Sequence, residues 1–153
     1  MTATTHTIRL HRVLRAAPER VYRAFIEPQA MVKWLPPDGF VGEVHEMDAR
    51  VGGGYRMSFT NFGTGARHLF GGKFLELTPH SRIRYSDKFD DPNLPGEMVV
   101  TLAFRPVACG TDLQVEQEGV PAVIPPEMCY LGWQESLSLL ARLVEANIPD
   151  EPD

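Results

Sequence analysis

The 153-residue sequence has few cysteines, no long apolar run and an excess of negative charge, and each of these features excludes a class of protein. Its two cysteines, Cys109 in an expected turn and Cys129 in the last expected helix, are too few for a disulfide framework and lack metal-binding spacing, so we expect reduced thiols. No apolar run is long enough to span a membrane, and residues 1–7 are polar and do not resemble a signal peptide. We therefore expect the protein in the cytoplasm.

The net charge of −5 argues against nucleic acid as the main partner, because neutralising phosphates requires a basic surface. Familiar catalytic motifs are also missing, since the sequence has no H-E-x-x-H, no paired C-x-x-C and no G-x-S-x-G. His45, Glu46 and Asp48 are close in sequence, but on a regular strand His45 faces opposite the two acids, which favours a surface position over a metal site. We therefore expect neither a metal nor a cofactor.

Residues 126–147 have the clearest pattern in the chain, that of an amphipathic helix. Trp133, Leu137, Leu140 and Val144 follow each other at helical spacing and form one apolar line. Flanking residues widen this line into an arc that needs a large partner surface: Tyr130 and Ala141 on one side, and Met128, Leu139 and Leu143 on the other.

The remainder of the chain predicts one strand, two short helices and then several more strands. The first strand is expected over residues 7–15, and the helices over 18–27 and 29–35 are too short to form a core, so we expect them to plug one end of the molecule. Later strands are expected over 40–50, 55–60, 67–77, 83–89, 98–105 and 111–120. Gly71 and Gly72 are expected to bend their strand or to let another backbone approach closely.

Hairpin connections between consecutive strands predict an antiparallel sheet, and the separation of helices from strands predicts an α+β fold. The pattern indicates a single domain over residues 1–148 and a disordered, acidic tail over 149–153.

Three ordered motifs resemble one known family. They are P-E-R-V-Y-R-A-F-I-E-P within residues 15–40, D-A-R-V-G-G-G-Y-R-M over 48–57, and G-W-Q-E-S-L-S-L-L within 132–145. Together they resemble the homologues of the activator of the heat shock protein 90 ATPase, which belong to the START-like, helix-grip (SRPBCC) superfamily. The resemblance covers nearly the whole chain.

The resemblance implies a strongly curved antiparallel sheet of about six to seven strands that grips the long C-terminal helix. It also implies that two short helices close one end, and that a hydrophobic cavity lies between the last helix and the sheet. It places the first strand beside the last, so Arg9 and His11 are expected to face Glu116 and Glu118.

Our first hypothesis is a binding module that encloses a small, largely apolar molecule between the last helix and the sheet. Asp87 and Gln117 share strand faces with core residues, so each would place a polar group in an apolar wall and orient the ligand. For both residues the alternative is a position that faces solvent. The proposed apolar lining consists of Trp34, Tyr55, Met57, Phe59, Phe74, Tyr85, Phe104, Tyr130, Trp133 and Leu137.

Two further hypotheses stay open. The protein is a cyclase, dehydratase or hydrolase for an apolar substrate if Asp87 is a buried acid or base within hydrogen-bond distance of a tyrosine hydroxyl. It is a protein-interaction module, a homodimer or a chaperone partner, if the flank formed by Met128, Leu139 and Leu143 is exposed. The shortage of catalytic motifs favours binding over catalysis.

Overall fold

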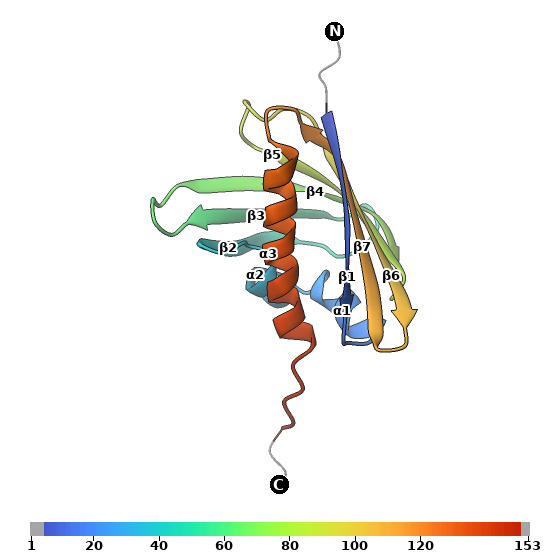
Figure 1. Ribbon diagram of the computed structural model, residues 1–153. Helices are drawn as coiled ribbons and strands as arrows, with labels where there is room; N and C mark the ends of the chain where they lie inside the picture. Colours follow the sequence, from blue (N-terminus) through green and yellow to red (C-terminus); the bar gives the residue numbers. More distant parts are fainter. Residues whose placement is uncertain (1–4, 151–153) are drawn as a thin grey trace.

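A computed structural model describes residues 5–150, in which a seven-stranded antiparallel sheet is combined with a long C-terminal helix and two short helices (Figure 1). The predicted α+β class and order of elements are confirmed. In chain order the elements are β1 (Thr5–Leu14), α1 (Pro18–Ala24), α2 (Pro28–Trp34), β2 (Phe40–Met47), β3 (Gly54–Asn61), β4 (Arg67–Thr78), β5 (Arg82–Phe89), β6 (Met98–Val107), β7 (Gly110–Pro121) and α3 (Pro126–Val144).

The strands lie in the order β1-β7-β6-β5-β4-β3-β2, so hairpins connect the consecutive strands from β2 to β7 and β1 joins the far edge beside β7. Arg9 pairs with Glu116 as expected, with Nε 2.8 Å from Oε2. His11 does not face Glu118, because in an antiparallel pair a step forward along β1 is a step back along β7. It pairs with Gln114, and its Nδ1 lies 3.1 Å from Oδ1 of Asp112.

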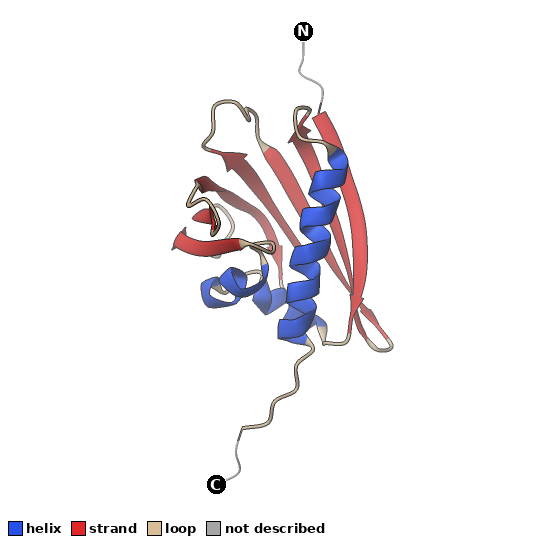
Figure 2. Cartoon of the chain, turned by 60° about the vertical axis from the view of Figure 1, so that its left-hand side comes forward, coloured by secondary structure: helices blue, strands red, loops and turns tan. Residues whose placement is uncertain are grey.

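The sheet curves around α3, which lies along its inner face (Figure 2). Pro126 and Glu127 occupy the first turn of α3, where a proline costs no hydrogen bond and a carboxylate favours the helix dipole. Leu137, Leu140 and Val144 are buried along the predicted line. The backbone of α3 packs closely against β1, α1 and α2, but within the described residues it makes no comparable approach to β2 through β7. Side chains and open space must therefore fill the distance between α3 and the middle of the sheet.

The two short helices close the lower end of the molecule, as predicted. The indole Nε1 of Trp34 donates to the carbonyl oxygen of Ala24 at 2.8 Å, and its ring packs edge-on against Phe25 with centroids 4.5 Å apart. Ser136 of α3 donates to the carbonyl oxygen of Leu35 at 2.6 Å, which fixes α2 to the long helix. Trp34 and Phe25 are both buried in the hydrophobic core at this end of the protein.

The predicted flank of α3 is only partly covered. Met128 and Leu143 are 62% and 39% exposed, whereas Leu139 packs against the core. Cys109 and Cys129 are free thiols. Residues 151–153 of the predicted tail lie outside the described part of the chain, and Pro149 and Asp150 belong to no helix or strand. Among residues 5–150, no helix combines the length and apolar character needed to cross a membrane.

Candidate functional site

A cavity of about 700 Å³ lies where α3 stands away from the middle of the sheet. Its walls come from α2 and the residues around it, from the inner face of β2 to β7, from the loop after β5 and from the N-terminal half of α3. Cavities that hold small molecules span roughly 300–1,000 Å³, so this volume is of the right order for one.

Many of the residues proposed for the lining do line this cavity. On the sheet side they include aromatic residues of three neighbouring strands, and on the helix side Trp133. The proposed residues that line the cavity are Tyr55, Phe59, Phe74, Tyr85, Asp87, Gln117 and Trp133.

The other proposed residues, Trp34, Met57, Phe104, Tyr130 and Leu137, do not line the cavity. Trp34 and Phe104 pack against Phe25, which itself lines the cavity.

Met57 and Leu137 are almost completely buried in the hydrophobic core. Tyr130 lies toward the sheet edge, where its hydroxyl accepts a hydrogen bond from the Arg9 N–H at 3.3 Å. Strand and helix periodicity identify an inward direction, but not whether the side chain meets a neighbour or open space.

Other lining residues were not predicted from the sequence, and they come from four places. The short helices and the residues after them supply apolar side chains, the loop after β5 supplies residues 90–92 and 94, α3 supplies small residues beside Trp133, and β2, β4, β5 and β6 supply further side chains. The expectation that the short helices close one end, and the Asp-Pro-rich sequence of the loop, could have indicated the first two sources. The residues not predicted include Met31, Met47, Arg67, His68, Asp91, Cys129, Gly132 and Ser136.

The polar centre of the cavity is a contact between Tyr55 of β3 and Asp87 of β5. The Tyr55 hydroxyl lies 2.8 Å from Oδ1 of Asp87 and 2.9 Å from the carbonyl oxygen of Ser86. A tyrosine hydroxyl has one proton and can donate fully to only one of these acceptors. If Asp87 is ionised the proton goes to Asp87, and if Asp87 is protonated the carboxyl group can donate to Tyr55 while Tyr55 donates to Ser86.

This contact spans a whole strand, because β4 lies between β3 and β5. Gly72 of β4 pairs with Tyr55, and a Cβ at Gly72 would collide with the carbonyl oxygen of Ser86. A Cβ at Gly71 would likewise collide with the carbonyl oxygen of Tyr55. The expected close backbone approach at Gly71 and Gly72 is confirmed.

Burial raises the pKa of Asp87 to about 7, although hydrogen bonds from Tyr55 and from the Lys88 backbone partly oppose the shift. Burial, and then the charge of Asp87, raise the pKa values of Tyr55 and Tyr85 above their ordinary value. Both tyrosines therefore keep their protons near neutral pH, whereas Asp87 exists in both forms. Asp87 is thus a cavity group that can gain or lose a proton near neutral pH.

Two other polar groups of the lining are already hydrogen-bonded across the cavity wall. The indole Nε1 of Trp133 donates to Oε1 of Gln117 at 2.9 Å, and Gln117 Nε2 donates to the sulfur of Met98 at 3.3 Å. The Ser136 hydroxyl is engaged with Leu35, as described above. These bonds tie α3 to β7 and to α2, and they fix the shape of the cavity.

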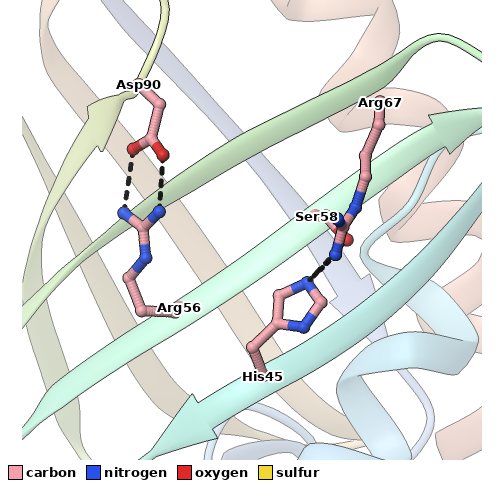
Figure 3. Close-up of polar contacts among 5 residues, drawn as sticks. All are labelled: His45, Arg56, Ser58, Arg67 and Asp90. Atoms are coloured by element: carbon pink, nitrogen blue, oxygen red, sulfur yellow. Dashed lines mark hydrogen bonds and ion pairs between the residues drawn. The ribbon is translucent and has the colours of Figure 1, made fainter.

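The outer face of the same strands has its own polar contacts (Figure 3). Alternation along β3 places Arg56 and Ser58 opposite the inward-facing Tyr55 and Met57. Arg56 forms a two-pronged ion pair with Asp90, with Nη1 2.8 Å from Oδ1. The charge of Asp90 is thus neutralised on the outer face of the sheet.

His45 is also on the outer face, with Nε2 2.9 Å from Oγ of Ser58 and 3.0 Å from Nη2 of Arg67 (Figure 3). The expectation that His45 and Glu46 face opposite sides is wrong, because the register shifts between Val44 and Glu46 and a bulge there turns both outward. Among residues 5–150, no three His, Cys, Asp or Glu side chains are grouped closely enough to hold a metal ion.

Comparison with known proteins identifies relatives of the whole chain. The family model described as Activator of Hsp90 ATPase homolog 1-like protein matches residues 15–145. The crystal structure of protein CV1439 from Chromobacterium violaceum is 62% identical, with a TM-score of 0.91 over 92% of this chain and 98% of the other. No match was found among curated proteins.

More distant solved structures share the fold. The AHSA1 protein from Silicibacter pomeroyi is 21% identical, with a TM-score of 0.79 over 92% of this chain and 98% of the other. Protein NE0264 from Nitrosomonas europaea is 23% identical, with a TM-score of 0.78 over 91% and 94% of the two chains. At these identities the likeness concerns the fold alone.

Proposed function

The chain belongs to the family of Activator of Hsp90 ATPase homolog 1-like proteins, and from this premise we propose that it binds a small, largely apolar molecule in the cavity beneath α3. One observation carries the proposal: α3 packs on β1 and the short helices but leaves about 700 Å³ of space above the middle of the sheet. Family membership alone names no ligand, because one fold serves many functions.

The character of the walls supports an apolar ligand. The rings of Tyr55, Phe74 and Tyr85 form one group, with centroids 5.7 to 6.5 Å apart. The ring of Phe59 packs against Phe70, with centroids 4.8 Å apart. Such rings offer a large apolar surface, and burying apolar surface gains roughly 25 cal/mol for each Å² removed from water. The polar residues of the cavity then select the orientation of the ligand.

Gly132 of α3 offers a direct test. It lines the cavity, and a Cβ built there meets no heavy atom within 4 Å. Gly132→Phe should therefore place a ring in the space that the ligand needs, whereas Gly132→Ala adds one methyl group and leaves most of the space open.

The experiment measures the fluorescence of a hydrophobic naphthalene probe, and its displacement by neutral apolar compounds, with native mass spectrometry to count bound molecules. The wild type and Gly132→Ala are expected to bind one molecule, and Gly132→Phe is expected to bind at least about tenfold more weakly. Absence of uptake by the wild type, or equal uptake by a folded Gly132→Phe protein, contradicts the proposal.

A second candidate function is proton transfer, which the 2.8 Å contact between Tyr55 and Asp87 favours. In this function Asp87 takes or gives the proton and a tyrosine hydroxyl stabilises the developing charge on the substrate oxygen. Deuterium exchange at the carbon beside the carbonyl of an aryl ketone, followed by NMR, tests it. The wild type should accelerate the exchange and Asp87→Asn should not, while both still bind the ketone; no acceleration by the wild type rejects this function for that substrate class.

A further inference from the structure

We infer that the ligand of this cavity is an apolar amine, which binds as its cation with the ammonium group against the carboxylate of Asp87. This inference rests on the proposed binding function and adds the chemical class of the ligand. Within residues 5–150, the Asp87 carboxylate in the cavity wall has acceptor positions without a donor and no ion-pair partner.

Most of the strong donors in the wall are already used. Trp133 donates to Gln117, and Ser136 donates to the Leu35 carbonyl oxygen. The Tyr55 hydroxyl is shared between Ser86 and Asp87. A ligand group that needs a donor from Trp133, Ser136 or Tyr55 would compete with these bonds.

Asp87 is different, because its acceptor capacity is only partly used. A carboxylate can accept about four hydrogen bonds, and Asp87 accepts from the Tyr55 hydroxyl at Oδ1 and from the Lys88 backbone. Among the ion pairs of residues 5–150, none includes Asp87. Asp87 is therefore a partly buried acid that lines the cavity and has no ion-pair partner among the described residues.

The neighbouring charges do not supply the missing cation. Asp90 is paired with Arg56 on the outer face, and the Arg67 guanidinium contacts His45 there. The titratable and charged groups that face Asp87 or lie around the cavity come from several elements. They are Tyr55 on β3, Tyr85 and Lys88 on β5, Arg67 and His68 on β4, Asp90 and Asp91 on the loop after β5, Cys129 on α3, and Glu97, whose charge acts on Tyr55.

An ammonium group supplies both things that Asp87 lacks, which are further hydrogen-bond donors and a neighbouring positive charge. It donates hydrogen bonds to the free positions of the carboxylate, and its charge stabilises the ionised form of Asp87 that burial disfavours. An anionic ligand would instead meet an uncompensated negative charge. A neutral alcohol could bond to Asp87, but without the charge assistance.

The test compares two matched fluorescent probes, 1-naphthalenemethylamine and 1-naphthalenemethanol, by isothermal calorimetry. At about pH 8 the wild type is expected to bind the amine at least tenfold more tightly than the alcohol, as is typical of a charge-assisted hydrogen bond. As the pH falls to about 6, Asp87 takes up its proton and the preference for the amine should shrink severalfold.

Asp87→Asn keeps the size of the side chain and an oxygen that can accept from Tyr55, but removes the charge. This variant should bind the two probes within about threefold of each other, with little change between about pH 6 and pH 8. Asp91→Asn is the matched control, since Asp91 is an exposed acid at the same cavity and loses the same charge. It should keep the preference of the wild type, and any remaining pH dependence in Asp87→Asn reports the other titratable groups, including His68.

The outcomes separate this inference from the proposed function. If the alcohol binds the wild type as tightly as the amine, or if Asp91→Asn lowers the preference as much as Asp87→Asn, the amine inference is wrong while the cavity remains a binding site. If neither probe binds, or both bind Gly132→Phe equally well, the binding function itself fails.

Discussion

The hydroxyl of Tyr55 lies 2.8 Å from Oδ1 of Asp87, and this hydrogen bond joins β3 to β5 over the glycines of the strand between them. It couples the geometry of the sheet to a carboxyl group in the cavity whose pKa burial raises to about 7.

Asp87→Asn should make the stability of the protein less dependent on pH. In the folded protein burial raises the pKa of Asp87 to about 7 from an ordinary value of 3.8, so between these two pH values the unfolded chain releases a proton that the folded protein retains. Ionisation therefore lowers the free energy of unfolding as the pH rises from about 4 to about 7, and the loss is complete above that range.

In Asp87→Asn no carboxyl group ionises at this position, so the free energy of unfolding does not fall in this way. Its free energy of unfolding should equal that of the wild type within about 1 kcal/mol near pH 3.5, and should exceed it by about 2–4 kcal/mol at pH 8. Urea unfolding of both proteins at several pH values measures the difference. A difference that stays constant across the range would show that Asp87 titrates like an ordinary surface acid.

Tyr55→Phe should raise the pKa of Asp87 further. The hydrogen bond from Tyr55 stabilises the ionised carboxylate, so its loss favours the protonated form, and the Ser86 carbonyl oxygen loses a donor as well. NMR titration of the Asp87 side-chain carboxyl carbon measures the shift, and the unfolding free energy should fall by about 1–3 kcal/mol.

Tyr85→Phe is the control for that variant. Tyr85 also lines the cavity, but none of the hydrogen bonds among residues 5–150 involves its hydroxyl. Its substitution should leave the pKa of Asp87 closer to the wild-type value than Tyr55→Phe does. A larger effect from Tyr85→Phe would contradict the arrangement described here.

Gly72→Ala should be strongly destabilising. The added methyl group would collide with the Ser86 carbonyl oxygen of the neighbouring strand, and backbone atoms cannot move aside as a flexible side chain can. We expect a loss of about 2–4 kcal/mol of unfolding free energy, or failure to fold.

Gly132→Ala is the matched control, because the same methyl group meets no atom within 4 Å and alanine favours helix by about 1 kcal/mol over glycine. It should leave the protein as stable or make it slightly more stable, as judged by thermal unfolding. Equal destabilisation by both substitutions would mean that the close approach at Gly72 is not what limits that position.

Much of the fold follows from local patterns. The 3.6-residue period of α3 identifies the buried line through Leu137, Leu140 and Val144, and the turns between strands identify the antiparallel meander. The family motifs place β1 at the far edge of the sheet. The pairing of His11 could also have been deduced, since the Arg9 to Glu116 pair determines the rest of an antiparallel register.

Local sequence patterns predict the residues of the cavity less completely than they predict the fold. The two-residue period of β5 puts Asp87 on the same face as Tyr85 and Phe89, and all three line the cavity. Whether an inward side chain meets a neighbour or a void depends on where α3 rests on the sheet, and contacts distant in sequence determine that. Trp34 and Leu137 illustrate the point, because both face inward as predicted but pack in the core and do not line the cavity.

The most direct test of the binding proposal is an NMR titration of the methionine methyl groups with 1-naphthalenemethanol. Met31 and Met47 line the cavity, Met57 and Met98 are buried outside its lining, and Met128 is exposed on α3. As the probe concentration rises, the methyl chemical shifts of Met31 and Met47 are expected to change and then level off in the wild type. They are expected to stay unchanged in Gly132→Phe. Shifts confined to Met128, or no shift of Met31 and Met47, would contradict it.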